Sequence, residues 1–194
     1  VDMPQSRWVL TRVRAHDGRT PAGGAPRPGH DLETTYEYVG GRHDRIEREF
    51  LGFAKVTRTN PDGTKVEQRF LNQTLLRKGL LESERLLDAD DRVWVETVST
   101  WSAPIPVGLP TEACIFRTPI ILNPESYCGS YFAPLDSVEK RFHEGQPRAG
   151  IVTRQRFQYT TLGDVKIFHD DGDIADPGDD LEATIAYWSA ASSL

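Results

Sequence analysis

The stretch TYEYVGGRHDRIEREFLGFAKV, residues 35–56, carries the clearest β-hairpin pattern in this sequence. Successive side chains of a strand point to opposite faces, so Tyr36 and Tyr38 share one face of a strand predicted over 34–39. Aromatic side chains in such positions stabilise a sheet through cross-strand pairs. Gly40-Gly41 then permits a turn, because glycine adopts positive φ without steric cost. The sequence predicts a strand followed by a glycine turn.

The second half of this stretch predicts the returning strand. Asp44 is expected to cap the turn by accepting hydrogen bonds from backbone N–H groups. Phe50 and Phe53 are expected to anchor the returning strand, with Gly52 marking a β-bulge or a point of close packing. These residue types predict architecture and no chemistry.

Short runs that alternate apolar and polar residues recur along the chain and predict an all-β fold of successive antiparallel hairpins. Asn60-Pro61-Asp62-Gly63 is the clearest turn, because proline presets φ and glycine accepts a positive φ. The predicted strands are 8–14, 34–39, 48–59, 64–71, 92–101, 113–122, 137–143, 151–160, 164–169 and 183–188.

Three segments depart from this pattern. Residues 20–29, rich in Pro and Gly, predict a surface loop, and residues 102–110, with three prolines, predict a division into 1–101 and 111–194. Residues 72–87 leave two alternatives, a helix from the spacing of the leucines or a strand over 79–87. The strand is favoured because Gly79 weakens a helix.

Composition limits the class of protein. The chain has 194 residues, which predicts one domain or at most two, and a start at Val1 without a signal-peptide pattern predicts a section of a longer protein. No run of 18 apolar residues occurs, so no membrane contact is expected. The net charge of −6 disfavours nucleic-acid binding. Seven acidic residues fall within 170–182 without a Lys or Arg, and the remaining residues sum to +1.

That acidic segment is the one metal candidate in the sequence. Asp171, Asp173 and Asp176 lie on a glycine-containing run, and carboxylate oxygens are the ligands that calcium prefers. The spacing departs from the EF-hand pattern. A solvated turn between strands is the favoured interpretation, and no cofactor is predicted.

The cysteines give no clear site. Cys114 and Cys128 lack the CxxC or histidine spacing of a zinc site, so two buried thiols are expected, with a disulfide as the alternative. The run from Cys128 resembles part of the papain signature, but Tyr131 stands where that family has its nucleophile. A Cys128 nucleophile paired with His143 or His169 is a less favoured alternative.

Other catalytic motifs are absent or misplaced. No Gly-x-Ser-x-Gly, P-loop or dinucleotide motif occurs. Glu82-Ser-Glu84 has the spacing found in ADP-ribosyltransferases, but Ser99-Thr100 follows it instead of preceding it, so a solvated acidic face is expected. Asn72-Gln-Thr74 fits a glycosylation sequon, a motif common by chance.

Residues 35–56 closely resemble a signature in the middle region of toxin-complex B subunits and Salmonella virulence plasmid B-like proteins. That signature reads approximately Tyr-x-Tyr, a Gly-rich turn, Tyr-Asp, and Arg-Glu-Phe-x-Gly-Phe. His43 stands where tyrosine is usual, and Ala54 where glycine is common. The matching positions are Tyr36, Tyr38, Gly41, Asp44, Arg48, Glu49, Phe50, Gly52 and Phe53.

A second segment, residues 157–165, resembles a degenerate Rhs (YD) repeat of the form Tyr-Asp-x-x-Gly-Asn-Val. Tyr159 and Gly163 match, while Thr160 replaces the Asp and Asp164 replaces the Asn. The position of this segment after the first signature strengthens the resemblance.

The resemblance implies both fold and role. In toxin-complex assemblies the B subunit and its Rhs-repeat partner wind long β-sheets into a hollow shell around a cytotoxic domain. The implied partners of this chain are other segments of the same shell, an Rhs-type partner subunit and a toxin effector polypeptide. No catalytic residue carries over, and the implied location is secreted or at the cell surface.

Two other hypotheses remain. The second is a stand-alone β-rich module that binds carbohydrate or protein through exposed aromatic side chains. Its candidate residues are Trp8, Trp94, Trp101 and Trp188. The third is an enzyme that uses Cys128 or the carboxylates.

Overall fold

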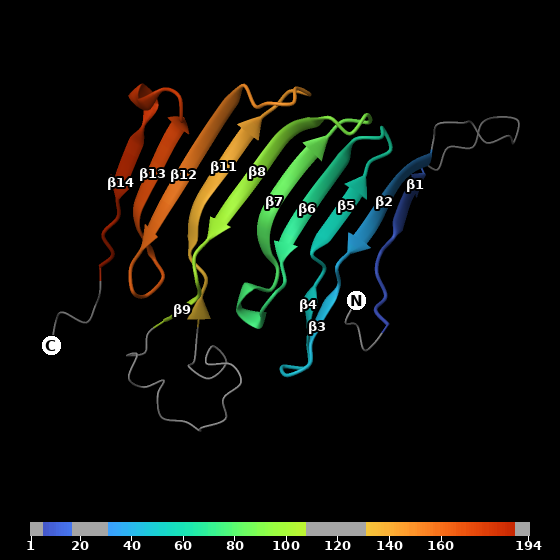
Figure 1. Cartoon of the computed structure of the whole chain (residues 1–194), viewed down its shortest axis with the longest axis horizontal. Helices are drawn as coiled ribbons and strands as arrows, with labels where there is room; N and C mark the ends of the chain where they lie inside the picture. Colours follow the sequence, from blue (N-terminus) through green and yellow to red (C-terminus); the bar gives the residue numbers. More distant parts are fainter. Residues whose placement is uncertain (1–5, 17–30, 108–130, 189–194) are drawn as a thin grey trace, which may run out of the picture. The chain divides into compact units, whose positions relative to one another are not determined.

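A computed structural model of the chain describes residues 6–16, 31–107 and 131–188 (Figure 1). In these ranges every element longer than three residues is a β-strand, and the strands pair as antiparallel hairpins. The predicted all-β fold is therefore confirmed. The chain divides into two units, Val1–Glu96 with Phe142–Gly150, and Thr97–Arg141 with Ile151–Leu194. No helix in the described ranges is long and apolar enough to cross a membrane.

Unit 1 holds a sheet with the strand order β1-β2-β5-β6-β7-β8 and a separate two-stranded sheet of β3 and β4. A short 3-10 turn, η1 (Leu75–Arg77), joins β6 to β7. The strands are β1 (Arg12–His16), β2 (Asp31–Val39), β3 (Arg42–Asp44), β4 (Glu49–Gly52), β5 (Lys55–Thr59), β6 (Lys65–Leu71), β7 (Leu80–Leu87) and the first residues of β8 (Val93–Trp101).

Unit 2 takes the rest of β8 and continues with the strand order β11-β12-β13-β14. A two-stranded sheet of β9 and β10 also belongs to it. Its elements are β9 (Ile105–Pro106), β10 (Tyr131–Phe132), β11 (Leu135–Phe142), β12 (Ile151–Tyr159), β13 (Val165–Asp173), the 3-10 turn η4 (Pro177–Asp179) and β14 (Leu181–Thr184).

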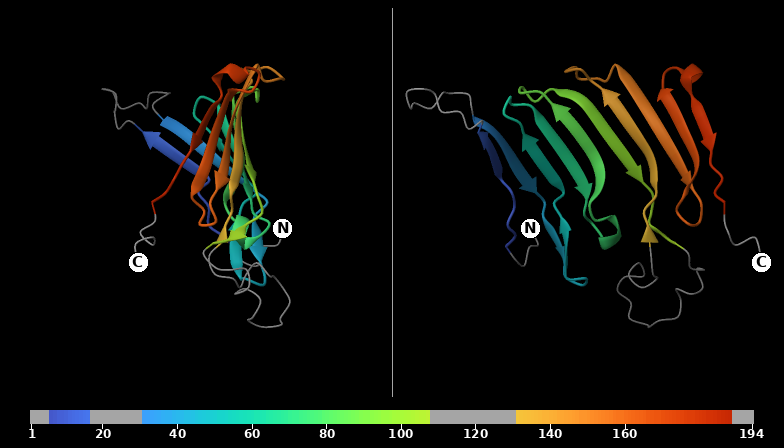
Figure 2. Two further views of the ribbon diagram at one scale, coloured as in Figure 1. Left: turned by 90° about the vertical axis from the view of Figure 1, so that its left-hand side faces the viewer. Right: turned by 180° about the vertical axis from the view of Figure 1, so that it is seen from behind.

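Within each unit the strands form a single layer (Figure 2). A sheet normally buries its apolar side chains against a second layer. Among the described residues, the buried apolar side chains are Leu51, Leu71 and Pro134. Large apolar side chains such as Leu32, at 56% exposure, remain open to solvent. Each unit is therefore stabilised mainly by backbone pairing and cross-strand contacts.

The strand predicted over 48–59 is wrong, because the structure contains two strands there in two different sheets. β4 pairs with β3, and β5 pairs with β2 and β6. The strand is interrupted between them after Gly52, whose φ is +88°. The predicted hairpin across Asn60–Gly63 is confirmed for β5 and β6.

Other boundaries also shift. The first strand begins at Arg12 and not at residue 8, because its pairing starts opposite Thr35. Residues 80–87 form a strand, which confirms that alternative over the helix. The strand expected over 164–169 continues to Asp173, and the last strand covers 181–184 instead of 183–188. The strand predicted over 113–122 and the loop over 20–29 lie outside the described residues.

Candidate functional site

The hairpin of β3 and β4 extends from the ends of β2 and β5 (Figure 1). The segment that follows β2 and the segment that precedes β5 come very close where they leave the main sheet. Gly40 has φ of +70°, and a Cβ added there would lie 2.8 Å from the Cβ of Ala54. The Ala54 N–H donates to the Gly40 carbonyl at 3.2 Å. Glycine is therefore required at position 40 for both its conformation and its lack of a side chain.

Asn72, directly after β6, joins the two points where the hairpin leaves the sheet. Its side chain is 6% exposed. Its amide Nδ2 donates to the Gly40 carbonyl at 2.9 Å and to the Gly52 carbonyl at 3.2 Å. Buried carbonyls need such partners. Because this amide is buried and bonded, the sequon at Asn72 offers no accessible site for a glycan.

Aromatic side chains of the signature pack together beside this junction. The rings of Tyr38 and Phe53 are 4.9 Å apart, and those of Phe50 and Phe53 are 5.2 Å apart in an edge-on arrangement. The Arg7 guanidinium lies 4.8 Å from the centre of the Phe50 ring, and the Tyr38 hydroxyl donates to the Leu10 carbonyl at 3.0 Å. Contacts of this kind add to the stability of a sheet. They also attach the segment before β1 to the hairpin.

The hairpin turn uses the cap predicted from Asp44. Its Oδ1 accepts from the N–H of Ile46 at 2.8 Å and of Glu47 at 3.1 Å. Arg48 completes the turn with φ of +56°, which is uncommon for a residue other than glycine. Glu49 follows and accepts from the Lys78 ammonium at 3.1 Å.

The returning strand contains the bulge expected near Gly52. Arg42 pairs with Gly52 and His43 pairs with Phe50, so Leu51 is the extra residue. Leu51 is fully buried. Gly41 lies between β2 and β3, and Tyr36 lies on β2 opposite Arg58. The role of the nine positions as a family signature stays a prediction.

The second motif forms the turn between β12 and β13 in unit 2. The Tyr159 hydroxyl donates to the Leu135 carbonyl at 3.0 Å, and its ring lies 4.9 Å from that of Phe132. Gly163 has φ of +90°, and Phe132 covers it at 3.5 Å from an added Cβ. Thr160 Oγ1 accepts from two backbone N–H groups at 3.2 Å, a bonding role that an Asp side chain can also fill.

In the part of the chain that the structure describes, the same five-residue turn occurs at 60–64, 88–92 and 160–164. In each, the first N–H donates to the fifth carbonyl at 2.8–3.0 Å, and the fourth N–H donates to the first carbonyl at 3.0–3.2 Å. The fourth residue always has positive φ. These residues are Gly63 (+84°), Asp91 (+64°) and Gly163 (+90°). The degenerate repeat is therefore one example of a recurring hairpin turn.

The main sheet of unit 1 has two different faces, which the register and the alternation of side chains assign. One face, called here the tyrosine face, carries Leu32, Tyr36, Tyr38, Val56, Val66 and Leu86. A groove of about 220 Å³ on it is lined by Tyr36, Val56, Arg58, Val66, Gln68 and Glu84. Gln68 donates to the Glu84 carboxylate at 2.7 Å.

The opposite face, called here the charged face, carries rows of ion pairs between neighbouring strands. Glu67 accepts from Lys55 on the neighbouring strand at 3.0 Å, and also from Arg69 on its own strand at 3.4 Å. Burial raises the pKa of Glu67, but the two cations outweigh it and leave the pKa below its usual value. Arg14 bonds Glu33 at 2.6 Å and lowers the pKa of that carboxyl. Opposite charges across strands stabilise this face without a second layer.

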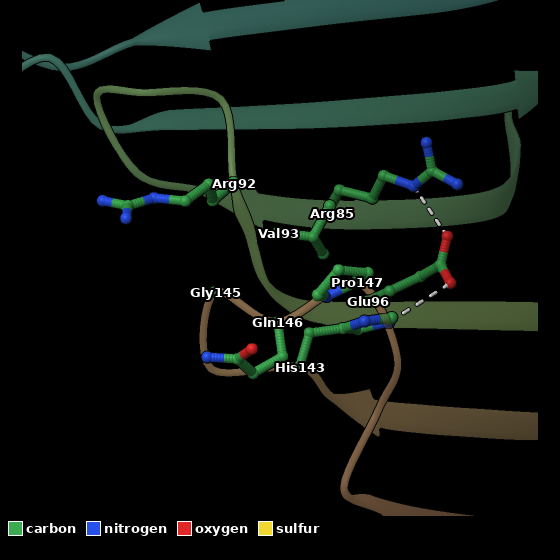
Figure 3. A pocket seen from close by; sticks show the side chains of 8 residues that line it. All are labelled: Arg85, Arg92, Val93, Glu96, His143, Gly145, Gln146 and Pro147. Atoms are coloured by element: carbon green, nitrogen blue, oxygen red, sulfur yellow. Dashed lines mark hydrogen bonds and ion pairs between the residues drawn. The ribbon is translucent and has the colours of Figure 1, made fainter.

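A pocket of about 330 Å³ lies in unit 1 where the connection after β11 meets β7 and β8 (Figure 3). Glu96 is 7% exposed and accepts from Arg85 Nε at 2.6 Å through Oε1. His143 Nε2 lies 4.0 Å from the other oxygen of Glu96. Both ring nitrogens of His143 are buried without a hydrogen-bond partner. The remaining lining residues are Arg92, Val93, Gly145, Gln146 and Pro147.

The acidic segment does not form the candidate calcium site. Asp171 belongs to β13, is 5% exposed and is bonded by Arg154 at 2.6 Å and by Arg156 at 2.5 Å. These bonds, first from Arg156 and then from Arg154, lower its pKa to about 2. Asp173 and Asp176 accept from nearby backbone N–H groups. Across the ranges that the structure describes, no cluster of three or more His, Cys, Asp or Glu is placed to hold a metal.

The segment that contains Gly40 and Asn72 matches a known family. The match covers residues 1–84, and the family is described as the insecticide toxin TcdB middle/N-terminal region. The predicted resemblance to the middle region of toxin-complex B subunits is confirmed. Comparison with curated protein sequences gives no significant match.

Solved structures agree on the fold. The crystal structure of TcdB2-TccC3 without its hypervariable C-terminal region aligns over 72% of this chain with a TM-score of 0.55 and 12% identity. The crystal structure of TcdB2-TccC3 aligns over the same share with a TM-score of 0.51 and 13% identity. This chain spans about 9% of the length of each matched chain.

Only part of the set of candidate catalytic residues falls on described residues. Cys114 and Cys128 lie outside the described residues. Glu84 is bonded to Gln68, which belongs to the groove on the tyrosine face. Among the tryptophans, Trp8 and Trp188 are strongly exposed, at 102% and 85%. Trp94 is 45% exposed, and Trp101 is half-buried.

Sequence reasoning missed three groups of residues. Asn72 had the signal of a polar residue directly after the apolar end of a strand. The Arg154-x-Arg156 spacing placed two cations on one strand face, which is the arrangement that binds Asp171. Glu96 and His143 are far apart in sequence, and no local signal connects them.

Proposed function

We propose that this chain is a noncatalytic part of the wall of a toxin-complex B-like protein, where it helps to enclose or deliver a polypeptide toxin. The observation that carries the proposal is the single-layered sheet of each unit, in which few of the described apolar side chains are buried. A sheet of this kind suits a wall, because backbone pairing continues along it while its faces meet other material.

The difference between the two faces of unit 1 supports this role. The charged face pairs its own charges, as in Lys55–Glu67 and Arg85–Glu96. The tyrosine face leaves Leu32 and Leu86 exposed, at 56% and 43%. A wall separates an inside from an outside, so its two faces meet different surroundings.

The proposed partners follow from the family and the solved neighbours. Those neighbours are TcdB2-TccC3 complexes, so we infer an Rhs-type partner subunit for the protein that contains this chain. Further segments of the same wall and the enclosed effector polypeptide complete the set. The inferred location is secreted or at the cell surface.

Labelling of single cysteines on the two faces of β2 tests the proposal. Leu32→Cys lies on the tyrosine face and Glu37→Cys on the charged face, each in a background with Cys114→Ser and Cys128→Ser. A bulky maleimide polymer should label both sites in the isolated chain. In the full-length protein assembled with its Rhs-type partner, one face should stay unlabelled.

Equal labelling of both faces in the assembled complex would contradict a wall. The state of the isolated chain gives a second readout, because exposed strand edges favour association. Dimers or larger species in light scattering support the wall. A clean monomer with a measurable sugar affinity would instead support the stand-alone binding module.

A further inference from the structure

The tyrosine face of unit 1 carries two opposite charges that its own residues do not pair. Arg58 on β5 is exposed and makes no ion pair with another described residue. Glu84 on β7 accepts from the neutral Gln68 amide at 2.7 Å, so within the described ranges its charge has no cationic partner either. β6 lies between the two strands. On the charged face, by contrast, Lys55 and Glu67 pair with each other at 3.0 Å.

The surroundings of these two charges are apolar. Val56 and Val66 line the same groove of about 220 Å³, and Leu32 and Leu86 on this face are 56% and 43% exposed. Sheets that stack face to face, about 10 Å apart, bury such side chains between them. A charge that becomes covered without a counter-ion is costly. A partner that covers this face must therefore bring an acidic group to Arg58 and a basic group to the other side of the groove.

We propose that the tyrosine face binds the tyrosine face of a second copy of this chain. In a symmetric dimer, residue i of one copy contacts residue j of the other, and j contacts i. Arg58 of each copy then meets Glu84 of the other, and the valines of both copies cover these ion pairs. A face that carried one sign of charge would repel its own copy, whereas this face is complementary to itself.

The dimer is separate from the proposed wall, and neither depends on the other. We expect a dissociation constant on the order of 10–100 µM, as for a small interface. At about 1 µM the chain is then monomeric, so Leu32 stays accessible to a labelling reagent at that concentration. Because labelling of the assembled complex tests the wall, failure of the dimer leaves that proposal standing.

Sedimentation velocity of the 194-residue chain and its charge-exchange variants, over about 1–300 µM, tests the dimer. Arg58→Glu places two acidic groups opposite each other and should raise the dissociation constant at least about tenfold, as should Glu84→Arg. The double variant Arg58→Glu/Glu84→Arg restores opposite charges and should return it to within about threefold of the wild type. Arg42→Glu reverses an exposed arginine of the separate β3–β4 sheet and is the matched control, which should leave it unchanged.

A monomer at about 300 µM, a dimer that Arg58→Glu leaves intact, or a double variant as weak as the single variants would each overturn the proposal. NMR of the unmodified chain decides the case even if the variants fold poorly. The methyl signals that shift with concentration should come from Val56, Val66 and Leu86. Shifts that gather instead at Val39 and Thr57, on the charged face, would equally rule out the dimer.

Discussion

Replacing Asn72 should destabilise unit 1 far more than its place outside a strand suggests. Asn72→Ala removes the bonds to the Gly40 and Gly52 carbonyls, each worth about 1 kcal/mol net. The Gly40 carbonyl keeps its bond from Ala54. The Gly52 carbonyl loses its bond from the Asn72 amide, which adds up to about 1 kcal/mol. The expected loss is therefore about 2–3 kcal/mol.

Urea unfolding followed by circular dichroism measures this loss. With a slope of about 2 kcal/mol per molar urea, the midpoint should fall by roughly 1–1.5 M. Hydrogen exchange should speed up most at the Ala54 and Phe70 amides, which bond across the junction. The exposed neighbour Gln73→Ala is the matched control and should stay within about 0.5 kcal/mol of the wild type.

A second substitution separates the hydrogen bonds from the side-chain volume. Asn72→Asp keeps the shape but turns an acceptor toward two carbonyl oxygens, so it should cost more than alanine, about 3–4 kcal/mol near neutral pH. If Asn72→Ala stays within about 0.5 kcal/mol of the wild type, or if Asn72→Asp is as stable as asparagine, the assigned role is wrong.

Three further substitutions test the electrostatics and the turns. Arg156 and Arg154 lower the pKa of Asp171 to about 2, so the stability that the ionised Asp171 gives the fold is present above about pH 4 and lost toward about pH 2. Asp171→Asn should therefore cost about 1–2 kcal/mol at pH 6 and flatten the acid limb of a pH-stability curve. At the second turn, Asp91→Gly should stay within about 0.5 kcal/mol of the wild type, whereas Asp91→Ala should lose about 1 kcal/mol at φ of +64°; equal melting of both would contradict the role of φ. Gly40→Ala should lose about 2–3 kcal/mol, and adding Ala54→Gly should restore about 1 kcal/mol by removing the contact but not the backbone strain, as thermal melting would show.

The parts of the fold that depend on local chemistry could be predicted from the sequence. The turn at Asn60–Gly63 and the cap by Asp44 each use residues within four positions of one another. The break between β4 and β5 could not be predicted in this way, because it depends on the approach of Ala54 to Gly40. The alternation of residues along one strand does not show which other segment of the chain packs against it.

The partners of the charged residues were even harder to predict from the local sequence. Seven acidic residues in thirteen positions predicted a solvated or metal-binding loop, but Asp171 turned out to be the buried partner of two arginines on the preceding strand. The pocket of Glu96 and His143 brings together residues that are 47 positions apart, so only the sheet order reveals it. Long-range partners follow from topology, which the local pattern does not contain.

The order of the strands bears on how such a chain folds. Within unit 1, β5, β6 and β7 each pair with the next strand in the sequence, and within unit 2 the same holds for β12 and β13. Pairs this close in sequence have a low entropic cost of loop closure and form quickly. These strands can therefore be added one after another as the ribosome releases them, whereas the segment Phe142–Gly150 joins unit 1 only later.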